Sequence, residues 1–322
     1  MKPMVTIGVC VRNCENTIKD AIESIIAQDY PHELMEAIFV DDGSEDDTLS
    51  IIERYATKMD MKVKVFSHAW KGLGSSRNVV IKNAKGDYII WVDGDMILSK
   101  DFVRSQVDFM EKNQRIGIAK GRYGLLSNEN LVYLLENIPY VVWTNKYAGN
   151  SVEKCVGTGG CVYRVKAIKE IGGFDEQLKG AGEDMDIEFR LRNAGWSICI
   201  SFATFYEKRP SSWAALWRKY YWYGYGLYES FGKNRYAEKL CFMSLPSAFI
   251  SGLLFSFDAY RFTRIKKIFL MLPIHFTYKM SAWWIGFIKN LSSTIKLRFV
   301  TREVKQEKNT HKQLKSKHVK NG

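Results

Sequence analysis

The stretch MVTIGVCVRNCENTIKDAIESIIAQDYPHELMEAIFVDDGS, residues 4–44, decides the fold. It begins with an apolar run rich in β-branched residues, continues with isoleucines at helical spacing, and ends in a second β-rich run at 36–41. A strand, a helix and a further strand of this kind form a βαβ unit, whose two strands are parallel. The stretch therefore predicts an α/β protein with a mostly parallel sheet.

The same alternation continues downstream. Further β-rich runs lie at 62–66 and 87–93. The helical sequences SEDDTLSIIERYATKM and SSRNVVIKNAKGD precede them, and acids at the start of the first favour a helix N-terminus. Ligands of such sheets bind at the carboxyl ends of the strands. Two acidic clusters are predicted at that edge, namely Asp41-Asp42 and Asp93-Gly94-Asp95.

Asp93 and Asp95 end an otherwise apolar run, IIWVDGDMIL at 89–98. Side chains two residues apart on an extended strand share a face, and Gly94 leaves room between them. Two carboxylates at a strand end suit Mg²⁺ or Mn²⁺, which usually bind substrate phosphates as well. The alternative is a turn in which Asp and Gly make local hydrogen bonds. Taken alone, the residue pattern leaves both readings open.

A glycine-rich loop and an acid-rich helix are predicted within 157–196. Gly157, Gly159 and Gly160 indicate a flexible loop, and GEDMDIEFRLRNAG indicates a helix with three acids at its start. Carboxylates in that position interact favourably with the helix dipole, which is the interpretation we prefer for Asp186. Asp184 can instead be presented into a cleft as a general base.

Five blocks, taken in order, resemble glycosyltransferase family 2, the inverting nucleotide-sugar transferases of the GT-A fold. The blocks are VTIGVCVRNCENTIKDAIESIIAQDYP, EAIFVDDGSEDDT, GLGSSRNVVIKNAKGDYIIWVDGDM, GTGGCVYRVKAIKEIGGFDE and GEDMDIEFRLRNAGW. Together they cover about residues 1–230, and five in the right order are far more specific than any one. The resemblance implies a Rossmann-like mixed sheet flanked by helices.

The resemblance also implies roles for the matching residues. Those expected to border the nucleotide sugar are Cys10, Arg12, Glu15, Asp41, Asp42, Arg77, Asp93 and Gly94, although Arg12 stands where a small or aromatic residue is commoner. Asp95, with Asp93, is expected to bind Mn²⁺ or Mg²⁺. Asp184 is expected to be the catalytic base, supported by Glu183. On the acceptor side we expect Gly159, Gly160 and Arg218, and for Arg218 a surface or membrane-facing role stays open.

The implied activity is metal-dependent, inverting hexosyl transfer from a UDP- or GDP-sugar to a saccharide acceptor. A lipid-linked or cell-surface glycan is the expected acceptor, and a polyprenyl-phosphate sugar synthase is the alternative. The Gln-x-x-Arg-Trp motif of processive synthases is absent, and WRKYYWYGYG in its place favours a single addition. The glycine-rich, lysine-bearing opening of a nucleotidyltransferase is not visible. Asp42, Asp95 and Asp184 together argue against an inactive relative.

The C-terminal part carries two apolar segments. Residues 240–257 hold no charge, and 268–288 hold only Lys279 besides His275. Each contains a proline and approaches the length that crosses a bilayer. Two spans would place the basic stretch 258–267 outside, against the positive-inside tendency. We therefore expect re-entrant or interfacial helices at the cytoplasmic face of the cell membrane, with two spans or an apolar soluble subdomain as alternatives.

The net charge of +12 arises almost entirely near the C-terminus. Residues 258–267 hold four basic side chains against one acidic, and 289–322 hold ten against two. Because these cations lie in a tail and a linker and are not interleaved with stacking aromatics on a folded face, they favour an anionic membrane surface over nucleic acid. We expect a catalytic domain at 1–230, divided near 98 into nucleotide and acceptor halves, a membrane-associated region at 231–295, and a disordered basic tail at 296–322.

Overall fold

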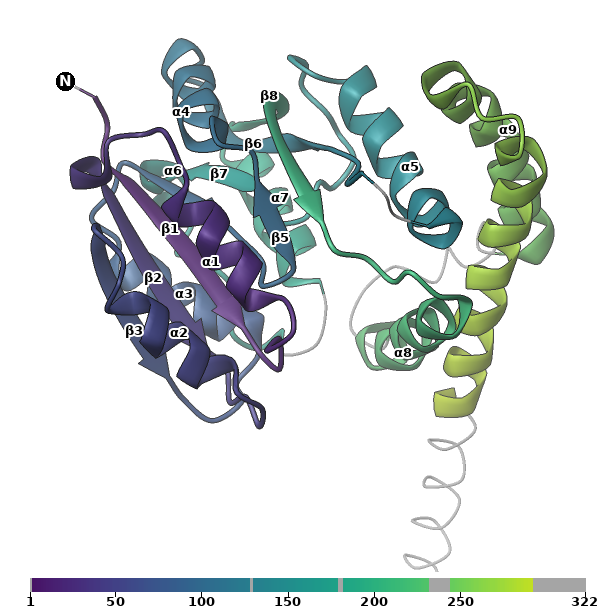
Figure 1. Ribbon diagram of the computed structural model, residues 1–322, viewed down its shortest axis with the longest axis horizontal. Helices are drawn as coiled ribbons and strands as arrows, with labels where there is room; N and C mark the ends of the chain where they lie inside the picture. Colours follow the sequence, from purple (N-terminus) through teal and green to yellow (C-terminus); the bar gives the residue numbers. More distant parts are fainter. Residues whose placement is uncertain (1, 128–129, 179–181, 232–243, 292–322) are drawn as a thin grey trace, which may run out of the picture. The chain divides into compact units, whose positions relative to one another are not determined.

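The computed structural model describes residues 2–127, 130–178, 182–231 and 244–291. An eight-stranded sheet with the order β3-β2-β1-β4-β7-β6-β8-β5 organises the first part of the chain (Figure 1). Its strands are β1 Val5–Val11, β2 Met35–Asp41, β3 Lys62–Ser67, β4 Tyr88–Trp91, β5 Met96–Leu98, β6 Ile116–Tyr123, β7 Cys161–Arg164 and β8 Ser197–Glu207.

The first half of the sheet is the predicted parallel arrangement. β1 lies between β2 and β4, and β2 also pairs with β3, all in parallel. The connecting helices are α1 Ile18–Ile26, α2 Thr48–Ala56 and α3 Leu73–Asn83. Ile18, Ile22 and Ile25 of α1 are fully buried, as their helical spacing predicts. The strands and helices predicted for the first ninety or so residues are therefore confirmed.

The second half makes the sheet mixed. β7 is antiparallel to both β4 and β6, β8 is parallel to β6, and β5 is antiparallel to β8. The helices of this half are α4 Phe102–Lys112, α5 Leu131–Lys146, α6 Val165–Glu170 and α7 Glu183–Asn193. The predicted mixed sheet flanked by helices is confirmed, whereas a mostly parallel arrangement holds only for the first half.

One hydrophobic cluster fixes α3, α6 and α7 on the same face of the sheet. Trp91 at the end of β4 lies in it and contacts Tyr163 and Phe174 edge-to-face, with ring centroids 6.0 and 5.9 Å apart. Figure 1 shows α1 and α2 in front of the sheet and α3 behind it. Helices α3 and α7 therefore pack against the same face of the sheet, close to Trp91 at the end of β4.

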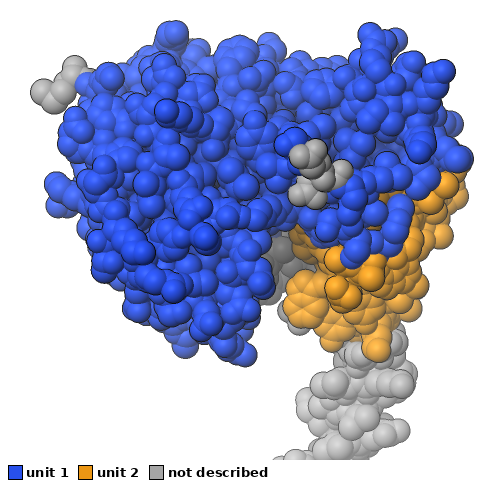
Figure 2. All heavy atoms as spheres, in the orientation of Figure 1, with its two compact units in different colours: residues 1–213, 253–272 blue, residues 214–252, 273–322 orange. Residues whose placement is uncertain are grey.

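The chain divides into two compact units, residues 1–213 with 253–272 and residues 214–252 with 273–322 (Figure 2). The C-terminal helices are α8 Trp213–Phe231, α9 Leu245–Thr263 and a helix over 268–291. None of the helices in the described ranges combines the length and the apolar character needed to cross a bilayer. The predicted division at 230 stays a prediction, and the basic tail at 296–322 lies outside the described residues.

Candidate active site

The carboxyl ends of β1, β2 and β4 meet at one edge of the sheet. Val11 pairs with Asp41 at the ends of β1 and β2, and the Val92 N–H donates to the Gly8 carbonyl at 3.0 Å. The residues that follow these three strands are the ones for which the sequence predicts ligand contacts. Cys10 lies close enough to Arg77, Asp93 and Asp42 for their charges to act on it, while burial raises the pKa of its thiol to about 12.

Asp42 is buried and shapes the loop before α3. Its carboxylate accepts hydrogen bonds from the Lys71 N–H at 2.8 Å and the Gly72 N–H at 3.0 Å, and His68 Nδ1 lies 3.4 Å away. Asp41 Oδ2 accepts from the Ser44 N–H and from Ser67 Oγ, each at 3.2 Å. Both aspartates therefore hold backbone that would border a ligand at this edge.

Arg12 and Glu15 tie the loop after β1 to the loop after β2. Arg12 Nε donates to the Gly43 carbonyl at 3.3 Å, and its guanidinium lies 5.8 Å from the centre of the Trp70 ring. Glu15 Oε2 accepts from the Asp47 N–H at 3.1 Å. Trp70 is 50% exposed and was not singled out from the sequence. Arg12 and Trp70 together form an exposed wall beside the loop that Asp42 holds.

The Asp93-Gly94-Asp95 segment is a turn between β4 and β5. The Met96 N–H donates to the Asp93 carbonyl at 3.1 Å, so of the two geometries that the sequence left open the structure has the turn. The strand ends at Trp91, and the turn reverses the chain directly after it. A Cβ at Gly94 would lie 2.7 Å from Cys14 Sγ, so only glycine fits there.

The turn is anchored on its far side by the segment that follows β8. The Asp95 carbonyl accepts from the Lys208 N–H at 2.8 Å, and the Lys208 ammonium pairs with Asp20. This anchor links Asp95 to α1, which carries Asp20. The backbone of Asp95 is therefore held by the segment after β8.

Arg77 joins α3 to the start of α7. Its Nη1 donates to Glu183 Oε1 at 2.7 Å, both side chains are buried, and the guanidinium lies 5.4 Å from the centre of the Phe174 ring. Burial raises the pKa of Glu183 and of Asp93, while the charge of Arg77 acts in the opposite direction on both. Arg77 is thus the cation shared by two carboxylates that come from separate elements.

The glycine loop at 157–160 brings Asp93 and Asp184 to one place. A Cβ on Gly157 would lie 3.6 Å from Asp184 Oδ2, and a Cβ on Gly159 would overlap Asp93 Oδ2. The Gly160 N–H donates to the Trp91 carbonyl at 2.8 Å, which fixes the loop against the end of β4. The sequence predicted both acids, Gly159 and Gly160 as site residues, and the structure places Asp93 against Gly159 and Asp184 beside Gly157.

Glu188 holds this loop onto α7 and was missed by the sequence reasoning. Its Oε1 accepts hydrogen bonds at 3.0 Å from the N–H groups of both Val156 and Gly157, and at 3.2 Å from Cys155 Sγ. Glu188 lies one helical turn after Asp184, on the same side of α7. That spacing is the signal that could have identified it.

Lys120 is a second buried charge that the sequence reasoning missed. It lies on β6, donates to the Gly159 carbonyl, and has the Tyr123 and Phe205 rings 5.1 and 5.3 Å away. Burial disfavours the ammonium, but the surrounding anionic groups outweigh it and raise the pKa of Lys120. A lysine inside the apolar strand sequence IGIAKGRY was the available signal.

Asp93 and Asp95 are the two carboxylates for which the sequence predicts binding of a divalent cation. Within the described ranges, no cluster of three or more His, Cys, Asp or Glu side chains is arranged to hold a metal. Two carboxylates fit Mg²⁺ or Mn²⁺ where substrate phosphates and water complete the coordination. Burial raises the pKa of Asp93, the charges of Arg77 and Lys120 act in the opposite direction, and those of Glu207 and Asp184 add to the effect of burial.

Arg218, predicted on the acceptor side, lies on α8 in the second unit, and its role stays a prediction.

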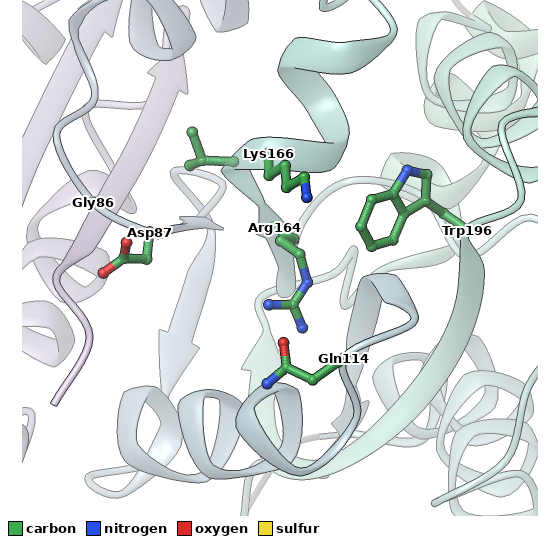
Figure 3. A pocket seen from close by; sticks show the side chains of 7 residues that line it. Gly86, Asp87, Gln114, Arg164, Lys166 and Trp196 are labelled. Carbon is green, nitrogen blue, oxygen red and sulfur yellow. The ribbon is translucent and has the colours of Figure 1, made fainter. Parts of the chain in front are cut away.

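A hollow of about 550 Å³ lies at the amino end of β4, away from the candidate site. It is lined by residues that include Asp87, Gln114, Lys166 and Trp196. Figure 3 shows the Arg164 guanidinium beside Gln114 in this hollow. Arg164 there donates to the Ile116, Met110 and Asn113 carbonyls and to the Tyr88 hydroxyl, so its role is structural.

The family of the chain follows from comparison with known proteins. Residues 6–172 match the sequence profile described as glycosyl transferase family 2. The chain belongs to glycosyl transferase family 2. The match includes Asp42, Arg77, Asp93 and the glycine loop, and it ends before Asp184. The family predicted from the five sequence blocks is confirmed.

Curated relatives of this glycosyltransferase are similar over part of their length. The chain is 34% identical over 101 residues to poly(ribitol-phosphate) beta-N-acetylglucosaminyltransferase TarS of Staphylococcus aureus, which is 31% of this chain and 18% of TarS. It is 36% identical over 113 residues to putative glycosyltransferase EpsE of Bacillus subtilis, which is 35% of this chain and 40% of EpsE. The chain thus spans less than half of either relative.

Solved structures confirm the GT-A fold of this glycosyltransferase. Mannosyltransferase PcManGT from Pyrobaculum calidifontis, in complex with GDP-Man and Mn²⁺, superposes with a TM-score of 0.62 at 17% identity over 90% of this chain and 88% of that one. TarS 1–349 from S. aureus, in complex with UDP-GlcNAc, superposes with a TM-score of 0.52 at 18% identity over 90% and 92% of the two chains.

The contact between Gly159 and Asp93 gives a first prediction. Gly159→Ala forces the Asp93 carboxylate to move, so we expect the rate of sugar transfer to fall about 100-fold, because displacements near 1 Å in a site have effects of that size. Gly172→Ala is the control, because a Cβ there meets nothing and only the φ of +80° opposes it. The initial rates of sugar transfer of the two purified variants test this prediction. Equal rates would mean that displacing the Asp93 carboxylate does not affect transfer.

Proposed function

We propose that this chain is an inverting hexosyltransferase that moves a sugar from a nucleotide sugar to a hydroxyl of a saccharide acceptor. The observation that carries the proposal is the convergence of Asp93 and Asp184 on the loop at 157–160. One carboxylate follows a strand on the nucleotide side of the sheet, and the other opens α7. This pairing suits a reaction in which one end of the site binds the donor and the other activates the acceptor.

In the proposed mechanism Asp184 is the general base. The acceptor oxygen attacks the anomeric carbon, the bond from that carbon to the diphosphate oxygen breaks, and the hydroxyl proton passes to Asp184. Attack opposite the leaving group inverts the anomeric configuration. Asp184 lies in the first turn of α7. Glu183 is held by Arg77 and so supports the base rather than replacing it.

The nucleoside is proposed to lie against the wall formed by Arg12 and Trp70. Trp70 offers an exposed ring, and the guanidinium of Arg12 lies near it and 3.5 Å from Glu45. The loop between this wall and α3 is held by Asp42 through the Lys71 and Gly72 N–H groups. A base stacked on Trp70 would therefore lie within reach of Asp42, the acid predicted to contact it.

Asp95, with Asp93, is proposed to hold Mn²⁺ or Mg²⁺. A divalent ion at this position neutralises the charge of the departing diphosphate when it is bound. In support, PcManGT was solved with GDP-Man and Mn²⁺ and has the same fold.

Removing the metal provides a second prediction. EDTA should abolish transfer, and Mn²⁺ should restore it. Asp95→Ala should weaken Mn²⁺ binding in the presence of UDP or GDP at least about tenfold, since one of two carboxylate ligands is lost. The binding is measured by titration calorimetry, separately from activity. The control is Asp108→Ala, an exposed carboxylate on α4. If the Asp95 and Asp108 variants bind Mn²⁺ equally well, Asp95 is not a ligand.

A cell-surface, lipid-linked glycan is the proposed acceptor. TarS, by its name, acts on poly(ribitol-phosphate), and this supports a glycopolymer acceptor for the related chain. The test is transfer by the purified full chain from a panel of UDP- and GDP-sugars to saccharides linked to polyprenyl diphosphate, with bare polyprenyl phosphate alongside. Transfer with inversion to a saccharide is the expected result. Glycosylation of bare polyprenyl phosphate alone would instead identify a polyprenyl-phosphate sugar synthase.

A further inference from the structure

The exposed face of α9 is apolar. Phe249, Ile250, Leu253, Leu254 and Phe257 are all exposed, and Leu254 is the most exposed at 66%. Their spacing of one, four, five and eight residues from the first places them on one side of the helix. This is the reverse of the usual pattern, in which the apolar side of a surface helix faces the core.

The covered side of α9 explains why the apolar side chains face outward. Ala248 and Ala259 are buried on the side of the helix away from the stripe, and the buried Ser256 lies between the two sides. Small residues there allow close packing but offer little apolar area. The five large side chains of the stripe lie outside this covered side, and contiguous exposed apolar surface of this kind is characteristic of an interaction site.

Basic residues follow the apolar stripe. Arg261 lies one turn after Phe257 and continues the stripe, with an 80% exposed side chain. Arg264, Lys266 and Lys267 come directly after the helix and are exposed as well. The carboxylate in this stretch is Asp258, which lies 4.0 Å from Arg261 and 4.0 Å from Lys146. The end of α9 therefore carries a clear excess of positive charge.

The helix over 268–291 repeats this arrangement. Leu270, Ile274, Ile285 and Ile288 are exposed, and at 100° per residue all of them lie within about a 60° sector of the helix. Lys267 lies in the turn that leads into this helix. Two consecutive helices thus each present an apolar stripe, with the basic turn between them in the sequence.

We propose that the apolar stripe of α9, together with Arg261, Arg264, Lys266 and Lys267, docks on an anionic lipid bilayer surface. Apolar side chains of an interfacial helix bury themselves at the boundary between headgroups and acyl chains, and basic residues attract anionic headgroups. The net positive charge beside the stripe is what selects lipid over an uncharged or basic protein partner. This inference concerns binding alone and does not rest on the proposed reaction.

The test is co-flotation of the full chain with vesicles of phosphatidylcholine alone or of phosphatidylcholine and phosphatidylglycerol in equal parts. The wild type should float with the anionic vesicles, and Leu254→Glu/Phe257→Glu should lower the partition coefficient at least about tenfold. Phe202→Glu is the matched control, because Phe202 on β8 is 56% exposed, like Phe257 at 54%. It should bind like the wild type.

The basic residues have their own variant and control. Arg264→Gln/Lys266→Gln/Lys267→Gln should lower binding to anionic vesicles about fivefold for each charge at low salt and leave binding to neutral vesicles unchanged. Lys58→Gln/Lys62→Gln/Lys82→Gln removes three exposed cations from the nucleotide half, with little expected change. All variants keep the basic C-terminal tail, so its attraction is common to them.

Three results would overturn the proposal. One is a wild-type chain that stays in solution beside anionic vesicles, and another is a Leu254→Glu/Phe257→Glu variant that floats as well as the wild type. The third is a lipid-free wild-type dimer that this variant dissociates, measured by light scattering, since the stripe would then be an interface between two copies. Sugar transfer to a soluble acceptor, measured in parallel, shows whether each variant is folded.

Discussion

Asp184→Asn should lower the rate of sugar transfer about 100- to 10,000-fold, the usual contribution of a general base, while affinity for the UDP- or GDP-sugar stays within about twofold. The amide cannot take the proton of the acceptor hydroxyl, yet it keeps the size of the carboxylate. Its oxygen can still accept from the Met185 N–H, as Asp184 Oδ1 does at 2.8 Å. The start of α7 should therefore keep its geometry.

The matched control is Asp186→Asn on the same helix. Asp186 pairs with Arg190 at 2.6 Å, four residues further along α7, so its role is structural. It should lose no more than a few-fold in rate, even if its melting temperature falls slightly. Rates of transfer and donor binding are measured for both variants. A similar loss in both, or a normal rate for Asp184→Asn, would remove Asp184 from the mechanism.

Arg77→Met should destabilise the protein by about 3–5 kcal/mol, because it leaves the buried Glu183 carboxylate without its cation. The expected effect far exceeds that of an exposed pair. Arg104 and Asp29 are 2.7 Å apart but partly exposed, so Arg104→Met should cost less than about 1 kcal/mol. Urea unfolding of the two variants measures both values. Equal destabilisation would mean that the buried Arg77–Glu183 pair contributes no more to the free energy of unfolding than the exposed Arg104–Asp29 pair.

A second substitution and a change of pH isolate the charge as the cause. Arg77→Met/Glu183→Leu should recover the part of the loss that comes from the unpaired Glu183 carboxylate, while the buried Asp93 still lacks the charge of Arg77. Burial already raises the pKa of Glu183, and loss of Arg77 raises it further. A carboxylate whose folded pKa exceeds its unfolded value destabilises the fold as pH rises between the two. The cost of Arg77→Met should therefore shrink as pH falls toward about 4.3, the unfolded value.

The first half of the fold could be predicted because its signals are local. The buried isoleucines of α1 recur at helical spacing within nine residues, and each strand is a short apolar run. β7 could not be placed in the same way. It lies between β4 and β6 and runs against both, and this depends on pairing such as Tyr88 with Arg164, residues far apart in the sequence.

The candidate site, like the fold, was predictable where it depends on local sequence and on the parallel strands of the first half. The acids that follow β2 and β4 share an edge because parallel strands end together, so topology alone places them. The sequence left two possibilities for Asp93-Gly94-Asp95, a continued strand or a turn, because the strands that pair with β4 determine where it ends. The partners of Arg77 and Lys120 could not be predicted either, because these contacts join residues far apart in the sequence. Glu183 lies 106 residues from Arg77, and Gly159 lies 39 from Lys120.

The hydrogen bonds from Val156 and Gly157 to Glu188 make the loop and α7 one mechanical unit. A rotation of α7 that shifts Asp184 also moves the backbone that faces Asp184. Exchanging acceptor preference between related enzymes should therefore work only when both segments are transplanted together. A chimera that takes residues 155–160 from one parent and 183–192 from another would break the tether and misalign the base with the new acceptor.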